Sequence, residues 1–292
     1  ARDVAERINA IQRFFVEETR LGIPAVFFDE TLHGLVRGGA TAFPQSVGLA
    51  AAWDAGLMER VAAAIAREVR SRGIRQALSP MLEVVRDVRW GRVEEVYGED
   101  PFLAARLGAA YVKAYERMGV IATPKVVIAN AGDGGRDSYP VQASERLLEE
   151  VYFPPFEAVV REGGATSIMT AYNSLDGRPC TANPWLLRTV VKGRWGLEGF
   201  IISDASAVGG LLDLHHTVAD REGSAESSIE AGLDVIFQTD YDHHALFLPA
   251  FLDGRLSAEV VDQAVARVLR AKFALGLFES PYVGTTSPPV DH

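Results

Sequence analysis

Apolar positions along the chain follow two alternating patterns, one typical of amphipathic helices and one typical of short buried strands. Residues 54–72 illustrate the helical pattern, because Asp54 is a suitable N-cap and the interior is rich in alanine. Helices are predicted over residues 2–20, 54–72, 100–118, 144–161, 184–194, 224–231 and 257–275. Strands are predicted over residues 23–28, 74–82, 120–128, 165–172, 200–203 and 233–237. Each predicted strand follows a predicted helix.

This alternation predicts a parallel sheet with right-handed crossovers, which closes into a barrel or stays open as a doubly wound sheet. The first strand is not followed by Gly-x-Gly-x-x-Gly, which argues against a dinucleotide-binding fold. Polar motifs follow nearly every strand, as in a TIM-type (β/α)8-like barrel with one functional rim. With six strands, the barrel is irregular or lacks a first βα unit. We expect one barrel domain over residues 1–283 and a loose tail, rich in Thr, Ser and Pro, over residues 284–292.

Composition narrows the classes of partner. The 292 residues are 48% hydrophobic, enough for one large core, and the net charge of −10 disfavours nucleic acids and anionic membranes. Cys180 is the only cysteine, so no intrachain disulfide can form. No apolar stretch is long enough to span a bilayer. The N-terminus resembles an amphipathic helix more than a signal peptide, so the location stays open between the cytoplasm and secretion after signal removal.

The polar motifs after the strands carry a specific resemblance when they are taken together. They include Asp29-Glu30-Thr31-Leu32-His33-Gly34, Ala42-Phe43-Pro44-Gln45-Ser46, Arg86-Asp87-Val88-Arg89-Trp90-Gly91-Arg92-Val93-Glu94-Glu95, Tyr97-Gly98-Glu99-Asp100-Pro101, Gly134-Gly135-Arg136-Asp137, Met169-Thr170-Ala171-Tyr172-Asn173, Ser203-Asp204 and Leu275-Gly276-Leu277-Phe278. Over nearly the whole chain they resemble the barrel domain of glycoside hydrolase family 3, the β-glucosidases and β-xylosidases. This resemblance implies a barrel that acts on a small glycoside or an oligosaccharide and needs no cofactor.

The resemblance makes Asp204 the catalytic nucleophile. A retaining glycosidase needs a carboxylate on one face of the anomeric carbon and an acid on the other, about 5–5.5 Å apart. The alternative is that Ser203 or Asp204 caps the following helix.

Family members hold the sugar with residues that correspond here to Glu30, Arg92, Lys125, Arg136, Met169 and Tyr172. Arg92 could instead form a structural ion pair with a nearby glutamate, and Met169 could belong to the core. Lys125 lies in an apolar strand, where an unpaired charge is costly to bury. His33 is expected to order its loop. Asp240, Asp242, His243 and His244 could hold a metal, but adjacent histidines rarely face one centre, so no metal is predicted.

Three departures from the family pattern concern the sugar site. The usual Lys-His-Phe appears as Lys125-Val126-Val127, and the aromatic residue after the nucleophile is Ala205, followed by Ser206. Both changes predict a wider, more apolar pocket. The acid/base is missing: most members carry it on a C-terminal α/β domain, and the Asp-Ser-His of the one-domain branch ends here in Tyr139.

Three hypotheses follow. The first is a retaining β-glycosidase whose hydrolysis is impaired because no general acid is evident. The second is a barrel re-engineered for another reaction, with Asp204 or Glu30 as base or Lys125 as amine nucleophile. The third is a non-catalytic sugar-binding relic.

Overall fold

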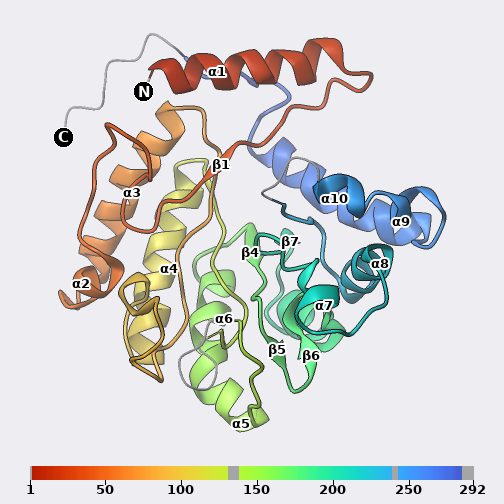
Figure 1. Cartoon of the computed structure of the whole chain (residues 1–292). Helices are drawn as coiled ribbons and strands as arrows, with labels where there is room; N and C mark the ends of the chain where they lie inside the picture. The colour runs from red at the N-terminus through yellow and green to blue at the C-terminus, as the bar shows by residue number, and fades with distance from the viewer. Residues whose placement is uncertain (1, 131–137, 239–242, 285–292) are drawn as a thin grey trace.

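A computed structural model describes residues 2–130, 138–238 and 243–284. Short parallel strands lie in the middle, and helices surround them (Figure 1). The strands are β1 (Phe28–Asp29), β2 (Gln76–Ala77), β3 (Ile121–Ala122), β4 (Ser167–Met169), β5 (Ser174–Leu175), β6 (Arg178–Pro179) and β7 (Phe200–Ile202). The α-helices are α1 (Arg2–Arg13), α2 (Ser46–Ala50), α3 (Ala55–Ser71), α4 (Pro101–Arg117), α5 (Glu145–Leu147), α6 (Phe153–Arg161), α7 (Gly210–Asp213), α8 (Arg221–Ala231), α9 (Pro249–Leu252) and α10 (Ala258–Ala274).

Other helical segments connect these elements. The π-helical segments are Phe14–Glu18, Leu148–Tyr152 and Trp185–Arg194, and the 3-10 turns are Val93–Glu95, Cys180–Ala182 and His243–Leu246. The π-helical segment at Phe14–Glu18 continues α1, so the predicted helix over residues 2–20 is one continuous run in two geometries. None of the described helices is both long and apolar enough to cross a membrane.

The parallel strands are joined in a continuous order. β1 pairs with β2, β2 pairs with β3, and β4 pairs with β7, all in parallel. Bridges between Val127 and Thr170 and between Ile202 and Val235 extend the order from β3 to β4 and from β7 to the last predicted strand. The rings of Phe28 and Phe237 meet edge to face at 5.0 Å, which brings the first and last strand segments together. The antiparallel β5–β6 hairpin is an addition that the sequence pattern did not predict.

Side-chain caps explain why the helices begin where they do. Asp54 accepts a hydrogen bond from Leu57 N at the start of α3, and Ser257 accepts one from Val260 N at the start of α10. Asp100 caps α4, which has a proline at its first position. Each of these polar residues marks the first turn of its helix in the sequence, so the predicted starts of these three helices agree closely with the structure.

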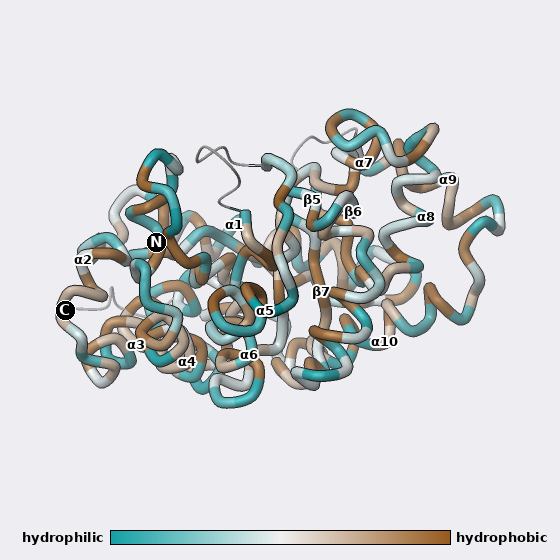
Figure 2. The backbone as a smooth tube through the Cα atoms, turned by 90° about the horizontal axis from the view of Figure 1, so that it is seen from below, coloured by the Kyte–Doolittle hydropathy of each residue, from teal (hydrophilic) through white to brown (hydrophobic). Residues whose placement is uncertain are grey.

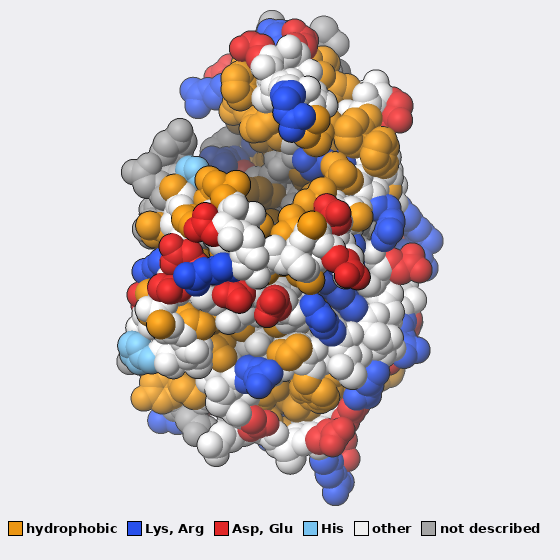
Figure 3. All heavy atoms as spheres, turned by 90° about the vertical axis from the view of Figure 1, so that its right-hand side faces the viewer, with side chains coloured by type: hydrophobic (Ala, Val, Ile, Leu, Met, Phe, Trp, Pro, Cys, Tyr) orange, Lys and Arg blue, Asp and Glu red, His pale blue; other side chains and the backbone are white. Residues whose placement is uncertain are grey.

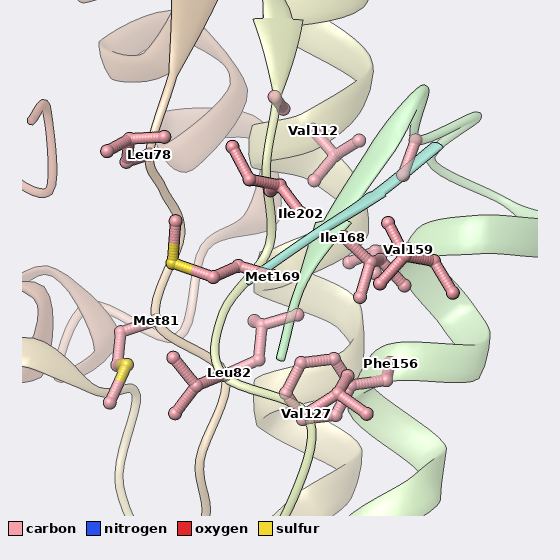
Figure 4. Close-up of a cluster of buried hydrophobic side chains, with 14 of the residues drawn as sticks. Leu78, Met81, Leu82, Val112, Val127, Phe156, Val159, Ile168, Met169 and Ile202 are labelled. Carbon is pink, nitrogen blue, oxygen red and sulfur yellow. The ribbon is translucent and has the colours of Figure 1, made fainter. Parts of the chain in front are cut away.

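The core lies between the strands and the inner faces of the helices. Apolar positions run along the interior segments, while the outer loops are mostly hydrophilic (Figure 2). Phe156 and Val159 of α6 pack with Leu82, Val127 and Ile168 (Figure 4). This cluster is fully buried, so it fixes the helices against the strands whose ends carry the predicted site residues.

One face of the molecule carries α8, α9 and α10. Acidic and basic side chains are interspersed there with apolar ones, and the surface is hollowed in the upper half of the view (Figure 3). Arg221 pairs with Asp213 at 2.6 Å, and Arg255 pairs with Asp220 at 3.5 Å. Opposite charges therefore lie beside each other on this face.

The N-terminal helix is held by residues from the far end of the described chain. Asn9 donates to the Val283 carbonyl at 2.8 Å and accepts from Val283 N at 2.9 Å. Gln12 donates to the Pro281 carbonyl at 3.2 Å, and the Tyr282 hydroxyl donates to Glu17 at 2.7 Å. The last described segment thus crosses α1 and its π-helical continuation; residues 285–292 of the predicted tail lie outside the described part.

Candidate active site

Four of the predicted site residues follow the carboxyl ends of parallel strands. Glu30 follows β1, Lys125 follows β3, Tyr172 follows β4 and Asp204 follows β7. Since these strands run in the same direction, their carboxyl ends meet at one edge of the fold. Two direct contacts join the four side chains into pairs. Lys125 Nζ lies 2.6 Å from Glu30 Oε1, and the Tyr172 hydroxyl donates to Asp204 Oδ1 at 2.8 Å.

Asp204 is a buried carboxylate with one oxygen already engaged. Asp204 is only 8% exposed. Its Oδ1 accepts hydrogen bonds from the Tyr172 hydroxyl and from the Ala205 N–H, the latter at 2.7 Å. Within the described residues Oδ2 has no hydrogen-bond partner. The next helix, α7, is capped at Gly209 without any side-chain bond, and Ser203 instead accepts from Phe237 N. The helix-cap alternative is therefore wrong.

Glu30 and Lys125 form a partly buried ion pair. The Lys125 side chain is 5% exposed and that of Glu30 43%, yet Glu30 Oε2 is buried and has no hydrogen-bond partner among the described residues. Burial raises the pKa of the Glu30 carboxyl, the Lys125 ammonium opposes this rise, and the nearby negative charge of Asp204 adds to it. The exposed part of the Glu30 side chain is what remains open to a ligand.

Arg92 lies close enough to Glu30 to lower the pKa of its carboxyl. Its guanidinium also binds Glu95 through two hydrogen bonds, Nε to Oε1 at 2.9 Å and Nη2 to Oε2 at 2.8 Å. The structural ion pair considered for Arg92 is therefore present, and it fixes the plane of the guanidinium at the edge of the site.

The other predicted residues are placed differently. Met169 has no exposed surface and extends from β4 toward Leu78 and Met81 in the core (Figure 4), which favours the core alternative. Arg136 lies outside the described residues. His33 Nδ1 is 3.0 Å from the Phe43 carbonyl, consistent with the loop-ordering role expected for it.

The expected widening of the pocket at Val126 is not found. Val126 and Val127 have no exposed surface and belong to the hydrophobic core, so they do not line an open space. The physical reason is that a short apolar side chain at this position packs inward with its neighbours. Ala205 and Ser206 are half-buried beside Asp204.

Sequence reasoning missed a histidine that supports the site. His215 Nε2 lies 2.7 Å from the Tyr172 carbonyl and so holds the backbone of the residue that donates to Asp204. The sequence does not distinguish His215 from its neighbour His216, so it did not indicate which of the two histidines contacts the site. No group of three metal-ligating side chains occurs in the described part of the chain; Asp240 and Asp242 of the metal alternative lie outside it.

Comparisons with known proteins show which family this sequence and fold resemble. The sequence matches the glycosyl hydrolase family 3 N terminal domain over residues 2–271. A β-xylosidase of Formosa agariphila is 37% identical, and the match covers 94% of this chain and 41% of that protein. A β-glucosidase structure from Erythrobacter marinus has a TM-score of 0.93 at 33% identity, covering 97% of this chain and 39% of the other. The Listeria innocua β-glucosidase in complex with glucose has a TM-score of 0.88 at 36% identity, covering 96% and 39%.

These matches confirm the predicted resemblance and the TIM-like barrel fold. They also show that the chain spans about two fifths of the length of these relatives. By its sequence match and its fold, the chain belongs to the N-terminal domain family of the family 3 glycoside hydrolases.

Proposed function

We propose that this barrel is the nucleophile-bearing part of a retaining β-glycosidase that acts on β-glucosides or β-xylosides through a glycosyl-enzyme on Asp204. The observation that carries the proposal is the arrangement of the Asp204 carboxylate: both hydrogen bonds fall on Oδ1, and Oδ2 has no partner among the residues that the structure describes. The names of the relatives, β-xylosidase and β-glucosidase, support the substrate class.

The mechanism follows from the contacts of the four strand-end residues. The Glu30 side chain, which is 43% exposed, accepts a hydrogen bond from a sugar hydroxyl, and Lys125 donates from the same side. Asp204 Oδ2 attacks the anomeric carbon; the new C–O bond forms as the bond to the leaving group breaks, and the leaving group departs with the electron pair. Water then attacks the same carbon; its new C–O bond forms as the bond to Asp204 breaks, the electron pair returns to the carboxylate, and the water proton passes to solvent. The Tyr172 hydroxyl holds Oδ1 throughout, which orients the carboxylate for attack.

The general acid is the missing component of this mechanism. No described side chain occupies an evident acid position, and loss of acid assistance typically lowers the rate about 10²–10⁴-fold. The chain alone is therefore proposed to cleave glycosides whose leaving group needs little protonation, such as dinitrophenyl glycosides. Because the relatives are more than twice as long, we propose that a further α/β domain supplies the acid.

The test is intact-mass analysis after incubation with 2,4-dinitrophenyl 2-deoxy-2-fluoro-β-glucoside and the matching xyloside. We expect one covalent adduct, mapped to the peptide that contains Asp204 and absent in Asp204→Ala. Asp213→Ala is the matched control, because this carboxylate lies on the next helix and is 59% exposed. Absence of an adduct with both reagents in the folded protein would refute the proposal.

A sugar-binding relic is the second candidate, and the partly exposed Glu30 side chain beside Lys125 supports it equally. It predicts glucose or xylose binding by calorimetry without any adduct on Asp204. The amine version of the re-engineered barrel receives less support, because the Lys125 ammonium is held by Glu30 at 2.6 Å. Borohydride trapping of a carbonyl compound on Lys125 would reverse that judgement.

A further inference from the structure

Thr31, which follows Glu30 in the chain, belongs to a cluster of four buried hydroxyl groups. Thr31, Ser79, Tyr111 and Tyr115 are each at most 1% exposed. Thr31 Oγ1 lies 2.6 Å from Ser79 Oγ, and Ser79 Oγ lies 2.9 Å from the Tyr111 hydroxyl. The Tyr111 hydroxyl in turn donates to the Thr31 carbonyl at 2.8 Å. The bonds therefore form a ring that leaves Thr31 through its side chain and returns to it through its backbone.

The donors and acceptors of this ring match when they are counted. A carbonyl oxygen only accepts, so the Tyr111 proton is needed by the Thr31 carbonyl. The Ser79 proton then goes to Tyr111 and the Thr31 proton to Ser79, which satisfies all three bonds in one direction around the ring. Tyr115 lies outside the ring, 2.9 Å from the Tyr111 hydroxyl. Loss of the Tyr111 hydroxyl would leave buried polar groups without partners, whereas loss of the Tyr115 hydroxyl would leave the ring intact.

The ring connects the backbones that carry both members of the ion pair. Thr31 follows Glu30 in the chain. Hydrogen bonds that fix the carbonyl and side chain of Thr31 therefore also fix the backbone from which the Glu30 side chain extends. Ser79 is followed by Pro80, whose carbonyl accepts from Lys125 N at 2.8 Å. Glu30 and Lys125 are 95 residues apart in sequence. The ring connects the two chain segments that carry them through a short series of hydrogen bonds.

We propose that Tyr111 and the hydroxyl ring are positioning groups that set the contact between Glu30 and Lys125 and thereby the affinity of the site for a sugar hydroxyl. Tyr111 does not reach the ligand; it acts through Thr31 and Ser79. The consequence for binding rests on the proposed function, but the effect on the ion pair does not.

The experiment compares two variants that break the ring with two that keep it. Tyr111→Phe and Thr31→Val each remove one ring hydroxyl with little change of shape. Tyr115→Phe removes a hydroxyl from the same helix one turn away, and Thr31→Ser keeps the ring hydroxyl. Titration of the Glu30 side-chain carboxyl by carbon-13 NMR reports the ion pair without substrate, and the rate of adduct formation with the dinitrophenyl reagents reports the site at work.

In both ring-breaking variants, we expect the Glu30 titration midpoint to move upward, because the opposing effect of Lys125 weakens. The second-order rate of adduct formation should fall about tenfold, which is near the upper end of the net contribution of one hydrogen bond between neutral groups. Tyr115→Phe and Thr31→Ser should leave both readouts near those of the parent. An unchanged Glu30 titration in folded Tyr111→Phe or Thr31→Val overturns the inference. If the parent forms no adduct, the proposed function fails while the titration still decides the role of the ring.

Discussion

Glu116 offers a quantitative test of how burial acts on this fold. It lies at the end of α4, and its carboxylate accepts three hydrogen bonds. Oε1 accepts Ala122 N at 3.1 Å and Thr166 N at 3.0 Å, and Oε2 accepts the Thr166 hydroxyl at 2.9 Å. No cation pairs with it in the described part of the chain. Burial outweighs these bonds and raises the pKa of Glu116 from 4.5 to about 7.

The sign of the resulting pH effect follows from linkage. Between pH 4.5 and about 7 the folded state holds a proton on Glu116 that the unfolded state has lost. The stabilisation is therefore complete below pH 4.5 and disappears as the pH rises through about 7. At about 1.4 kcal/mol per pKa unit, the raised pKa makes Glu116 lower the free energy of unfolding by about 3 kcal/mol at pH 8 relative to pH 4.

Glu116→Gln removes the ionisable group while keeping its hydrogen bonds to Ala122 and Thr166. The amide oxygen can accept the two backbone N–H groups, and the amide nitrogen can donate to the Thr166 hydroxyl. We expect the variant to be more stable than the parent at pH 8, by up to about 3 kcal/mol, and to differ little from it at pH 4.5. Urea unfolding followed by circular dichroism across this range measures both curves.

The matched control for this substitution is Glu162→Gln. Glu162 is 55% exposed and pairs with Arg106 at the surface, so the same chemical change there should leave the pH dependence unaltered. Parallel pH profiles for the parent and Glu116→Gln, or a less stable variant at pH 8, would refute the reasoning.

Two further predictions concern the strands that carry the site. A methyl group added at Gly199 would lie 1.8 Å from a backbone oxygen of the neighbouring chain segment, so Gly199→Ala should lower the free energy of unfolding by about 3 kcal/mol or more. Gly210→Ala, where the nearest atom is 4.0 Å away, should change the thermal midpoint little. Tyr172→Phe removes a donor to the Asp204 carboxylate and should slow adduct formation about 10–100-fold; an unchanged rate would contradict the role of this hydroxyl.

Much of the fold could be predicted from local chemistry. Helix starts are encoded by single residues such as Asp54 and Ser257, so their positions follow directly from the sequence. Strands were predicted too long: the run over residues 23–28 ends in a ladder of only Phe28–Asp29. An apolar run indicates which residues are buried. Buried residues extend beyond those that form the hydrogen bonds of the sheet, so the predicted strand is longer than the observed one.

Candidate site residues could be named from the sequence, but the contacts between them could not. Asp204 and Lys125 stand out because a charged residue in an apolar run needs a reason. Their partners are 32 and 95 residues away, and no local pattern identifies them. The hydroxyl ring was missed for the same reason, since threonine, serine and tyrosine occur in many settings. The prediction for Val126 was wrong because sequence does not reveal which way a short apolar side chain packs.

The two hydrogen bonds between Asn9 and Val283 have a consequence for folding during synthesis. The two residues are 274 positions apart, so α1 leaves the ribosome long before the segment that holds it. At ordinary translation rates this delay is on the order of tens of seconds. During that time Ile11 and Phe14, which stay about half exposed even in the finished fold, are available to chaperones or to other nascent chains. Slower translation should therefore increase aggregation of the newly made chain more than it affects the stability of the folded protein.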